Sequence, residues 1–436
     1  MGRRPQELRR TCHRRRVARS MSATRSYVPR KGRFFYGYLI VAAAFVVAAT
    51  AWGSNRAYGV FLAPMLDEFG WTRAGISGVF TLNALVTGIA AIVAGRLTDR
   101  FGPRVVLLVC GLFLGLGYGL VSLVHSAWQF YLFYGILAGV GMGGAWAPLM
   151  STVARWFVKR RSLMSGILTA GPAVGIVFFP VVTALVISAY GWRDSFIILG
   201  AVVVPLVLAG SLFLRRDPRD MDMMPYGAEA SMDKTSRMQA QGLTFQSAVR
   251  TRYFWSLAMV YFCDSFLINA IVVHIVVYAQ GMGISSTSAA SVLSVAAGVG
   301  IPARVLTGAM GDALGNRRAL AICLATALAA FGILLAAKSL GMLYAFAALY
   351  GVSLWATGGL LSPLVAEFFG LKAHATLFGM VVLVGAIGGA VGPVAVGAIF
   401  DAAGSYTSAF VLCLAVNAAS LLLVLSLFRA RTWRPA

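Results

Sequence analysis

Twelve apolar stretches, each long enough to cross a lipid bilayer as a helix, run through this 436-residue chain. A spanning helix needs roughly 20 apolar residues, because the hydrocarbon layer is about 30 Å thick and a helix rises about 1.5 Å per residue. Of all residues, 59% are hydrophobic and only 12% are charged, too few charges to cover a soluble protein of this length. We therefore predict an all-α membrane protein, with spans that begin near residues 36, 75, 104, 128, 162, 194, 253, 285, 319, 340, 375 and 406.

The basic residues lie almost entirely on one side of the predicted membrane. Of 37 Lys and Arg residues, 32 fall in the two tails and in the loops after spans 2, 4, 6, 8 and 10. The loops on the other side hold Arg73, Arg193 and Lys338, and Arg56 and Arg304 lie inside spans. Because cytoplasmic loops carry the excess of positive charge, both termini are predicted to face the cytoplasm and its anionic lipid surface. The net charge of +23 is thus read as a topology signal, and no nucleic-acid partner is expected.

The N-terminal stretch 1–34 is basic but lacks the apolar core and cleavage site of a secretory signal. Its composition predicts a disordered cytoplasmic tail, and a second Met at position 21 leaves the start codon open. The five cysteines lie singly, without the spacing of a disulfide or a metal site. We expect no metal and no other cofactor.

Two stretches share a rare pattern, G-x-x-x-D-x-x-G-x-R, at residues 95–104 (GRLTDRFGPR) and 308–317 (GAMGDALGNR). The same separation along the chain maps Lys159 onto Lys372. A constant register implies two halves of six spans, and because six is even the halves are parallel repeats. The predicted organisation is a basic tail 1–34, a six-helix bundle 35–214, a polar cytoplasmic linker 215–252, a second bundle 253–429 and a short tail 430–436.

This repeated loop resembles the best-known loop motif of the major facilitator superfamily. The resemblance implies that family's fold, with twelve transmembrane helices in two parallel six-helix repeats. In that family the loop steadies one conformation of the transport cycle. The glycines of the motif suit close helix approach, and its carboxylates can pair with arginines. The resemblance therefore implies gating roles, and no substrate contact, for Asp99, Arg100, Arg104, Asp312 and Arg317.

A narrower resemblance lies at residues 156–175, WFVKRRSLMSGILTAGPAVG, which are similar to the span-5 motif of the monocarboxylate transporters. FYGYLIV at 35–41 and VHIVVYA at 273–279 resemble spans 1 and 7 of bacterial relatives of that family. The resemblance implies secondary transport of a small organic anion by alternating access, with a monocarboxylate and proton symport as the leading expectation. It further implies a monomer in a bacterial inner membrane.

Ionisable side chains inside spans are costly and are therefore candidates for function. Arg304 lies in span 8, roughly 10 Å inside its cytoplasmic end. A guanidinium can grip a carboxylate through two parallel hydrogen bonds. The A-R-x-x-x-G context of Arg304 matches the arginine that holds the substrate carboxylate in monocarboxylate transporters. The alternative is a side chain that snorkels to the cytoplasmic surface.

Proton coupling needs a group that titrates, and animal monocarboxylate transporters carry an aspartate where this chain has Gly300. Asp264 in span 7 is our candidate, because it should lie at the depth of Arg304; a cytoplasm-facing polar residue is the alternative. His274 could bind the anion or relay a proton, unless it is hydrogen-bonded between helices. Arg56 in span 1 could attract anions, or snorkel outward, but arginine does not deprotonate in proteins.

Trp146 in span 4 and Trp355 in span 10 match cavity aromatics of related anion carriers, with packing as the alternative role. Span 11, residues 375–400, has no Lys or Arg, whereas the similar oxalate/formate antiporters place a second basic residue there. This favours a single carboxylate over exchange of a dianion. AGPAVG in span 5 only faintly resembles the motif of drug/proton antiporters, a further alternative. The chain has no Gly-Lys pair, no H-E-x-x-H motif and no loop long enough for a catalytic domain, so we expect neither an enzyme nor a sensor.

Overall fold

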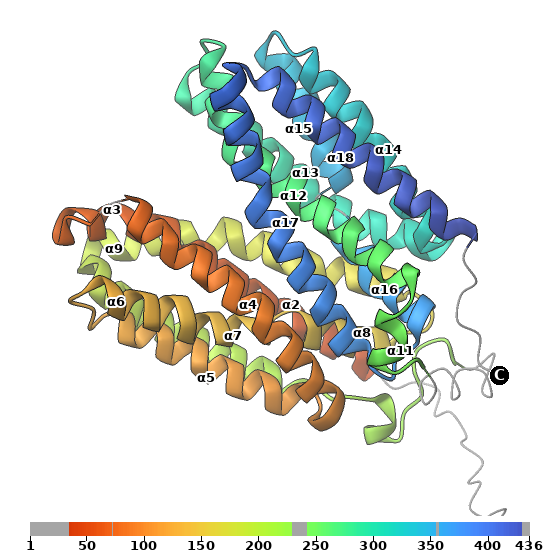
Figure 1. The fold of residues 1–436 in the computed structure, drawn as a ribbon. Helices are drawn as coiled ribbons and strands as arrows, with labels where there is room; N and C mark the ends of the chain where they lie inside the picture. The colour runs from red at the N-terminus through yellow and green to blue at the C-terminus, as the bar shows by residue number, and fades with distance from the viewer. Residues whose placement is uncertain (1–34, 72, 229–241, 355–356, 430–436) are drawn as a thin grey trace, which may run out of the picture. The chain divides into compact units, whose positions relative to one another are not determined.

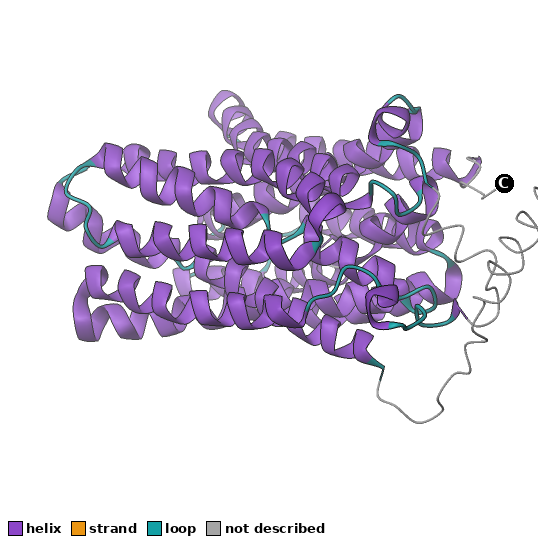
Figure 2. Ribbon diagram, turned by 90° about the horizontal axis from the view of Figure 1, so that it is seen from below, coloured by secondary structure: helices purple, strands orange, loops and turns teal. Residues whose placement is uncertain are grey.

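The computed structural model describes residues 35–71, 73–228, 242–354 and 357–429. The predicted tails 1–34 and 430–436, and the middle of the linker, lie outside the described residues. The chain divides into a short unit, Met1–Tyr36, and a large one, Gly37–Ala436, and everything below concerns the large unit. In the described part every long element is a helix (Figure 2).

The helices fall into two groups along the chain, separated by the linker. We call α2 to α9 the N-terminal half: α2 (Tyr36–Arg56), α3 (Tyr58–Phe69), α4 (Arg73–Phe101), α5 (Pro103–Val121), α6 (Ala127–Phe130), the π-helix η1 (Tyr131–Ala138), α7 (Gly139–Gly143), α8 (Ala147–Trp156) and α9 (Arg161–Phe213). The linker carries η2 (Pro218–Met221) and α11 (Phe245–Val249). The C-terminal half holds α12 (Arg252–Gly281), α13 (Ser286–Leu314), α14 (Asn316–Leu335), α15 (Leu340–Ser353), α16 (Gly358–Phe369), α17 (His374–Ala403), α18 (Tyr406–Ser426) and η5 (Leu427–Arg429).

The predicted count of twelve spans is confirmed once α9 is divided. Eleven helical runs among the described residues are long and apolar enough to cross a membrane. One of them, α9, has 53 residues, about 80 Å of helix, which is far more than one bilayer crossing requires. Gly191 inside it has φ 78° and ψ 169°, a conformation that no helix contains and that glycine adopts readily. The chain therefore turns at Gly191, and α9 contributes spans 5 and 6.

Spans 4 and 10 are broken near their middle. In span 4 the π-helix η1 and α7 are followed by a break at 144–146, after which α8 begins. In span 10, α15 ends at Ser353 and α16 begins at Gly358. Irregular backbone at membrane depth is tolerated where it is buried in protein or lines a cavity, and in transporters such breaks surround the substrate site.

The most extensive contacts between the two halves are those of α4 with α17 and of α9 with α13, and α16 also contacts α8 and α9, while α17 also contacts α8. Figure 1 shows α17, in blue, running along α4, in orange. Both pairs rely on glycine for close approach. A Cβ on Gly95 would lie 2.7 Å from the carbonyl carbon of Ala375, and one on Gly308 would lie 2.9 Å from that of Ser162. Gly95 and Gly308 are equivalent positions of the repeat, as are Ser162 and Ala375, so the two contacts are copies of each other.

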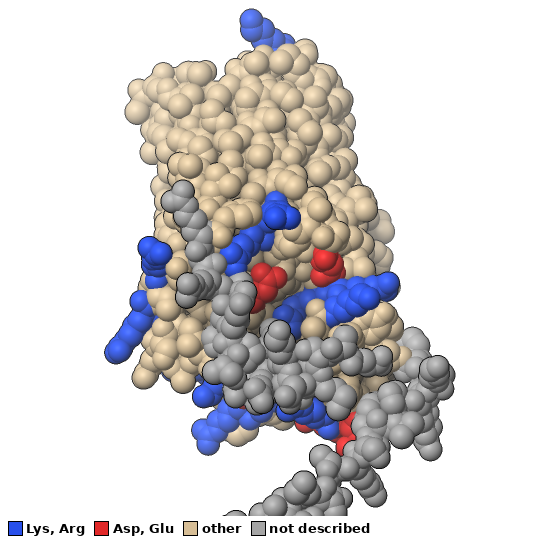
Figure 3. Space-filling view, turned by 90° about the vertical axis from the view of Figure 1, so that its right-hand side faces the viewer, with Lys and Arg blue, Asp and Glu red and all other residues tan. Residues whose placement is uncertain are grey.

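The linker pairs with one loop of each half. Tyr226 forms a parallel bridge with Phe157 after span 4, and Gly242 forms an antiparallel bridge with Gly370 after span 10. Phe157 and Gly370 are again equivalent positions of the repeat. We call the end of the bundle that carries these loops the linker end. In Figure 3 most Lys and Arg side chains gather in the lower part of the face shown, and tan residues cover most of the rest.

Close packing of α2 on α9 gives a stability prediction. A Cβ on Gly175 would lie 2.8 Å from the carbonyl carbon of Ala49 and 3.0 Å from its Cα, both backbone atoms that cannot yield cheaply. Gly175→Ala should lower the free energy of unfolding by about 1–3 kcal/mol, seen as an earlier transition in a thermal scan. Gly332→Ala is the control, because no atom lies within 4 Å of a Cβ there. Equal midpoints for the two variants would contradict this packing.

Candidate functional site

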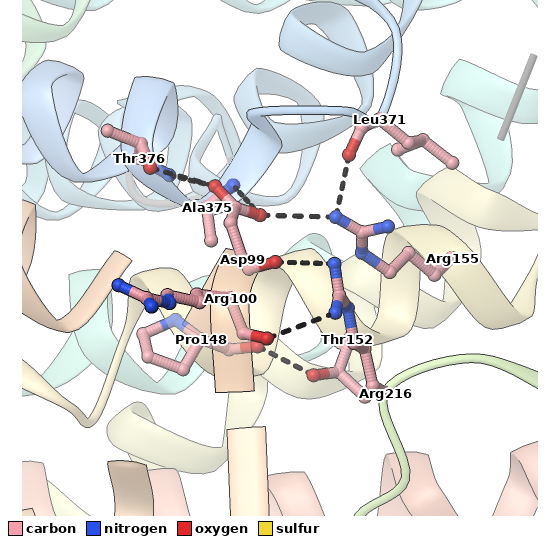
Figure 4. A network of polar contacts seen from close by, with 9 residues as sticks. All are labelled: Asp99, Arg100, Pro148, Thr152, Arg155, Arg216, Leu371, Ala375 and Thr376. Carbon is pink, nitrogen blue, oxygen red and sulfur yellow. Dashed lines mark hydrogen bonds and ion pairs between the residues drawn. The ribbon is translucent and has the colours of Figure 1, made fainter. Parts of the chain in front are cut away.

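Asp99, near the end of α4, binds the first turn of α17 in the other half (Figure 4). Its carboxylate accepts hydrogen bonds from the backbone N–H groups of Ala375 (3.4 Å) and Thr376 (3.0 Å) and from the Thr376 hydroxyl (2.8 Å). First-turn N–H groups lack partners within their own helix, and the helix N-terminus favours negative charge. The contact therefore joins the halves electrostatically as well as by hydrogen bonds.

Arg155 on α8 completes this network. Its guanidinium donates to Asp99 at 3.1 Å and to the Leu371 carbonyl at 2.6 Å (Figure 4). The side chains of Arg155 and Asp99 are only 6% and 12% exposed, so this ion pair is largely shielded from solvent. Arg216 of the linker donates to the backbone carbonyl of Asp99. Sequence reasoning counted Arg155 only as a loop charge and missed its role as the partner of Asp99.

Asp312 repeats the contact at the other interface between the halves. It accepts hydrogen bonds from the backbone N–H groups of Ser162 (3.0 Å) and Leu163 (2.9 Å), in the first turn of α9. The repeat relates these three residues, position for position, to Asp99, Ala375 and Thr376. Both predicted gating aspartates thus lie between the halves, at the linker end.

The three predicted gating arginines make other contacts. The Arg100 guanidinium lies 5.0 Å from the centre of the neighbouring Phe101 ring, and Arg104 is exposed at the start of α5. Arg317 donates to the Leu427 carbonyl at 2.8 Å. The described ion pair of Asp99 is with Arg155 of span 4, and not with an arginine of the motif loop. The gating roles of these arginines stay predictions.

Asp264 and Arg304 lie close to each other inside the membrane-spanning part. Asp264 on α12 is 4% exposed and accepts a hydrogen bond from the Thr357 hydroxyl at 2.8 Å. Arg304 on α13 is half-buried and donates to the Thr169 carbonyl of α9 at 3.0 Å. The two charges interact electrostatically. Thr357 adjoins the break in span 10, and Thr169 belongs to the other half.

Trp146 lies at the break in span 4, between the halves. Its ring meets that of Trp52 edge to face, with centroids 5.8 Å apart, and its side chain lies close to that of Tyr261 of α12. Tyr261 is one helical turn before Asp264. Trp146 therefore lies near Asp264, and its role as a cavity aromatic stays a prediction. Trp355 lies outside the described residues.

His274 and Arg56 are not part of this group. The Nε2 of His274 donates to the Pro393 carbonyl at 2.9 Å, and its Nδ1 pairs with the Tyr406 hydroxyl at 3.2 Å. Both ring nitrogens are thus used between helices, which is the structural alternative considered from sequence. Arg56 is exposed at the end of α2, with its guanidinium 5.5 Å from the centre of the Phe80 ring. Their functional roles stay predictions.

Comparison with known proteins identifies the family. The model of the Major Facilitator Superfamily matches residues 41–393 and 304–435. The chain belongs to the major facilitator superfamily. It is 28% identical over 386 residues to monocarboxylate transporter 13 of Bos taurus, covering 86% of this chain and 85% of that protein. It is 26% identical over 411 residues to monocarboxylate transporter 4 of Gallus gallus, covering 92% and 85%.

A solved structure shares the fold. The crystal structure of the human organic anion transporter MFSD10 (TETRAN) matches with a TM-score of 0.70, covering 89% of this chain and 99% of that one. At 15% identity this match supports the fold alone. Together the comparisons show a multi-pass membrane transporter, not an enzyme, that resembles the monocarboxylate transporter branch of the superfamily.

This major facilitator protein also contains a buried polar cluster that sequence reasoning missed. Asn55 donates to the Asn83 side-chain oxygen at 3.0 Å, and Asn83 donates to the Tyr134 carbonyl at 2.8 Å. The Tyr134 hydroxyl returns a bond to the Asn55 carbonyl at 2.9 Å. The sequence did contain a signal for this cluster. Asn55 and Asn83 lie inside apolar spans, where a buried amide needs hydrogen-bond partners.

At the end opposite the linker, Glu68 joins two loops of the N-terminal half. Arg193 and the Trp192 indole N–H both donate to its carboxylate, and these bonds hold the pKa of Glu68 below its usual value. Arg193 also donates to the Val124 carbonyl at 3.2 Å. Because the folded-state pKa is lowered, this stabilisation is present at neutral pH and is lost as the pH falls through the folded pKa.

Asp99→Asn should release α17 from α4. An amide keeps the size of the side chain but removes the charge, and it leaves Arg155 buried without its counter-ion, a change that typically costs about 3–5 kcal/mol. We expect spin labels at the exposed positions Phe101 and Lys372 to show a larger population of long distances in pulsed electron resonance. Asp401→Asn, at the opposite end of α17, is the matched control. An unchanged distance distribution for Asp99→Asn would rule out the gating role.

Proposed function

We propose that this protein is a secondary active transporter that carries a small organic anion, most simply a monocarboxylate, together with a proton. The observation that carries the proposal is the pair of Asp264 and Arg304, two opposite charges that interact inside the spans, near the contact between the halves. Similarity to proteins named monocarboxylate transporters and to one titled an organic anion transporter supports the same substrate class.

Arg304 is the proposed binding group for the substrate carboxylate. A guanidinium has five N–H donors in a planar fork, so it can hold the Thr169 carbonyl and grip a carboxylate as well. Trp146 and Tyr261 would form the aromatic wall beside the anion. Within the spans an anion gains more from such a cation than it would in water, because the local dielectric constant is lower.

Asp264 is the proposed proton carrier. In this proposal Asp264 is ionised while the site is empty, because the positive charge of Arg304 offsets part of the cost of burying its carboxylate. A bound anion neutralises that charge, so the buried Asp264 can then take a proton. The Thr357 hydroxyl, which donates to the carboxylate at 2.8 Å, can also accept from the protonated form. Substrate and proton would therefore load together, which is what symport requires.

The contacts of Asp99 and Asp312 would close the linker end during part of the transport cycle. In this proposal that end faces the cytoplasm, with both termini, because it carries most of the basic residues. Release of α17 and α9 from these carboxylates would open the same end and let the halves rock around the substrate. We place the protein, as a monomer, in a bacterial inner membrane.

Arg304→Lys should weaken transport strongly although the charge is kept. Lysine is a point donor without the planar fork, and loss of one charge-assisted hydrogen bond lowers affinity about 10- to 100-fold. Uptake of labelled monocarboxylates of one to six carbons into proteoliposomes gives the measurement. Arg318→Lys, at an exposed position of α14, is the matched control. If a folded Arg304→Lys variant took up substrate with wild-type affinity, Arg304 would not be the binding group for the carboxylate.

Asp264→Asn should separate exchange from accumulation. The amide cannot take up a proton, so substrate exchange across the membrane should persist while accumulation driven by a pH gradient is lost. Both are measured in the same proteoliposomes, with Asp401→Asn as the control, since that exposed carboxylate lies far along α17. Normal accumulation by Asp264→Asn would refute this coupling mechanism. His274 would then be the next candidate, and an anion exchanger of the oxalate/formate type the next function.

A further inference from the structure

A cavity of about 490 Å³ lies at the linker end of the C-terminal half, where α12 begins and α18 ends. The two helices pack against each other along the membrane. None of its lining residues belongs to the proposed transport path or to the contacts between the halves. The cavity is lined by Arg252, Tyr253, Ser256, Leu422, Leu425 and Ser426.

One end of this cavity is cationic and the other is apolar. Arg252 is exposed, and the Tyr253 side chain orients its guanidinium, which donates to the phenolic oxygen at 3.2 Å and lies 5.1 Å from the ring centre. Leu422 and Leu425 are 67% and 46% exposed. A ligand that fits both ends must carry a negative charge next to a long apolar group.

The depth of the cavity in the membrane agrees with such a ligand. Trp255, 45% exposed, donates its indole N–H to the Val249 carbonyl at 2.9 Å. Half-exposed tryptophan and tyrosine with one polar end are typical of the headgroup level of a bilayer. Arg252 precedes Trp255 and so lies at the level of lipid phosphates. Leu422 lies one helical turn, about 6 Å, before Ser426 on α18, deeper in the membrane, and so at the level of acyl chains.

We propose that this cavity binds one anionic phospholipid, with its phosphate on Arg252 and an acyl chain along Leu422 and Leu425. Basic pockets between spanning helices on the cytoplasmic side of a membrane take anionic headgroups, because that surface is rich in them. Charge complementarity selects an anionic lipid over a zwitterionic one, and the adjoining apolar surface selects a lipid over a free anion. The site rests on the proposed orientation, with the linker end in the cytoplasm, but not on the roles of Asp264 and Arg304, so failure of the transport tests leaves it standing.

The test is binding of phosphatidylglycerol to the full chain, titrated in detergent and followed by native mass spectrometry. Arg252→Ala should weaken binding about fivefold. Arg250→Ala is the matched control, because it removes the same charge at a nearby exposed position outside the cavity. Its affinity should stay within about twofold of the wild type. Ser426→Trp keeps Arg252 but places a bulky side chain in the cavity, and it should also weaken binding.

Two comparison ligands complete the test. Phosphatidylcholine should bind the wild type more weakly than phosphatidylglycerol, and inorganic phosphate at equal concentration should not displace the lipid. Equal losses from Arg252→Ala and Arg250→Ala would show a diffuse charge effect and overturn the site. Displacement by inorganic phosphate would show a simple anion site and overturn the lipid assignment. A thermal scan of each variant separates lost binding from lost folding, and Ser426→Trp decides the matter if Arg252→Ala does not fold.

Discussion

A carboxylate bound to the first turn of a helix is the interaction on which the arrangement of the two halves depends. Asp99 binds the first turn of α17, and Asp312 binds that of α9. The first N–H groups of a helix need partners from outside the helix, and these carboxylates supply them. Because these bonds are made to backbone atoms, they fix the position of the whole helix. A shift of an ångström or two would break them.

The two copies of this contact are unequal. Asp99 is also paired with the buried Arg155, whereas the residue equivalent to Arg155 in the second half is Phe368. Asp312 is itself exposed, so water can compete for its hydrogen bonds. Asp312 therefore lacks the equivalent of the buried arginine that pairs with Asp99. Arg304 lies at this second interface, where it donates to Thr169 of α9.

Much of this architecture could be predicted from sequence because it depends on pattern. Apolar run lengths gave the twelve spans, the repeated loop motif gave two halves, and counting depth along antiparallel spans put Asp264 near Arg304. Which side chains pair with each other could not be predicted, because that depends on the direction of each side chain in the packed structure. The break in span 4 and the packing of the halves bring Arg155 to Asp99, and no local pattern marks this. His274 is a second example. The sequence left it as a candidate for binding the anion or relaying a proton, but in the structure its two ring nitrogens hydrogen-bond Pro393 of α17 and Tyr406 of α18.

A ligand can shift a conformational equilibrium only by as much as its affinity differs between the two states. Arg304 meets that requirement, since its guanidinium binds the Thr169 carbonyl of the opposite half, a bond that separation of α9 from α13 would break. A substrate carboxylate on Arg304 would offset the lost bond, and a proton on Asp264 would remove the charge left buried beside it. Without substrate and proton, Arg304 would lose the Thr169 bond with no replacement and Asp264 would stay buried as a charged group, so separation of α9 from α13 would be less favourable. In this mechanism the same two side chains bind the substrate and decide when the halves can move.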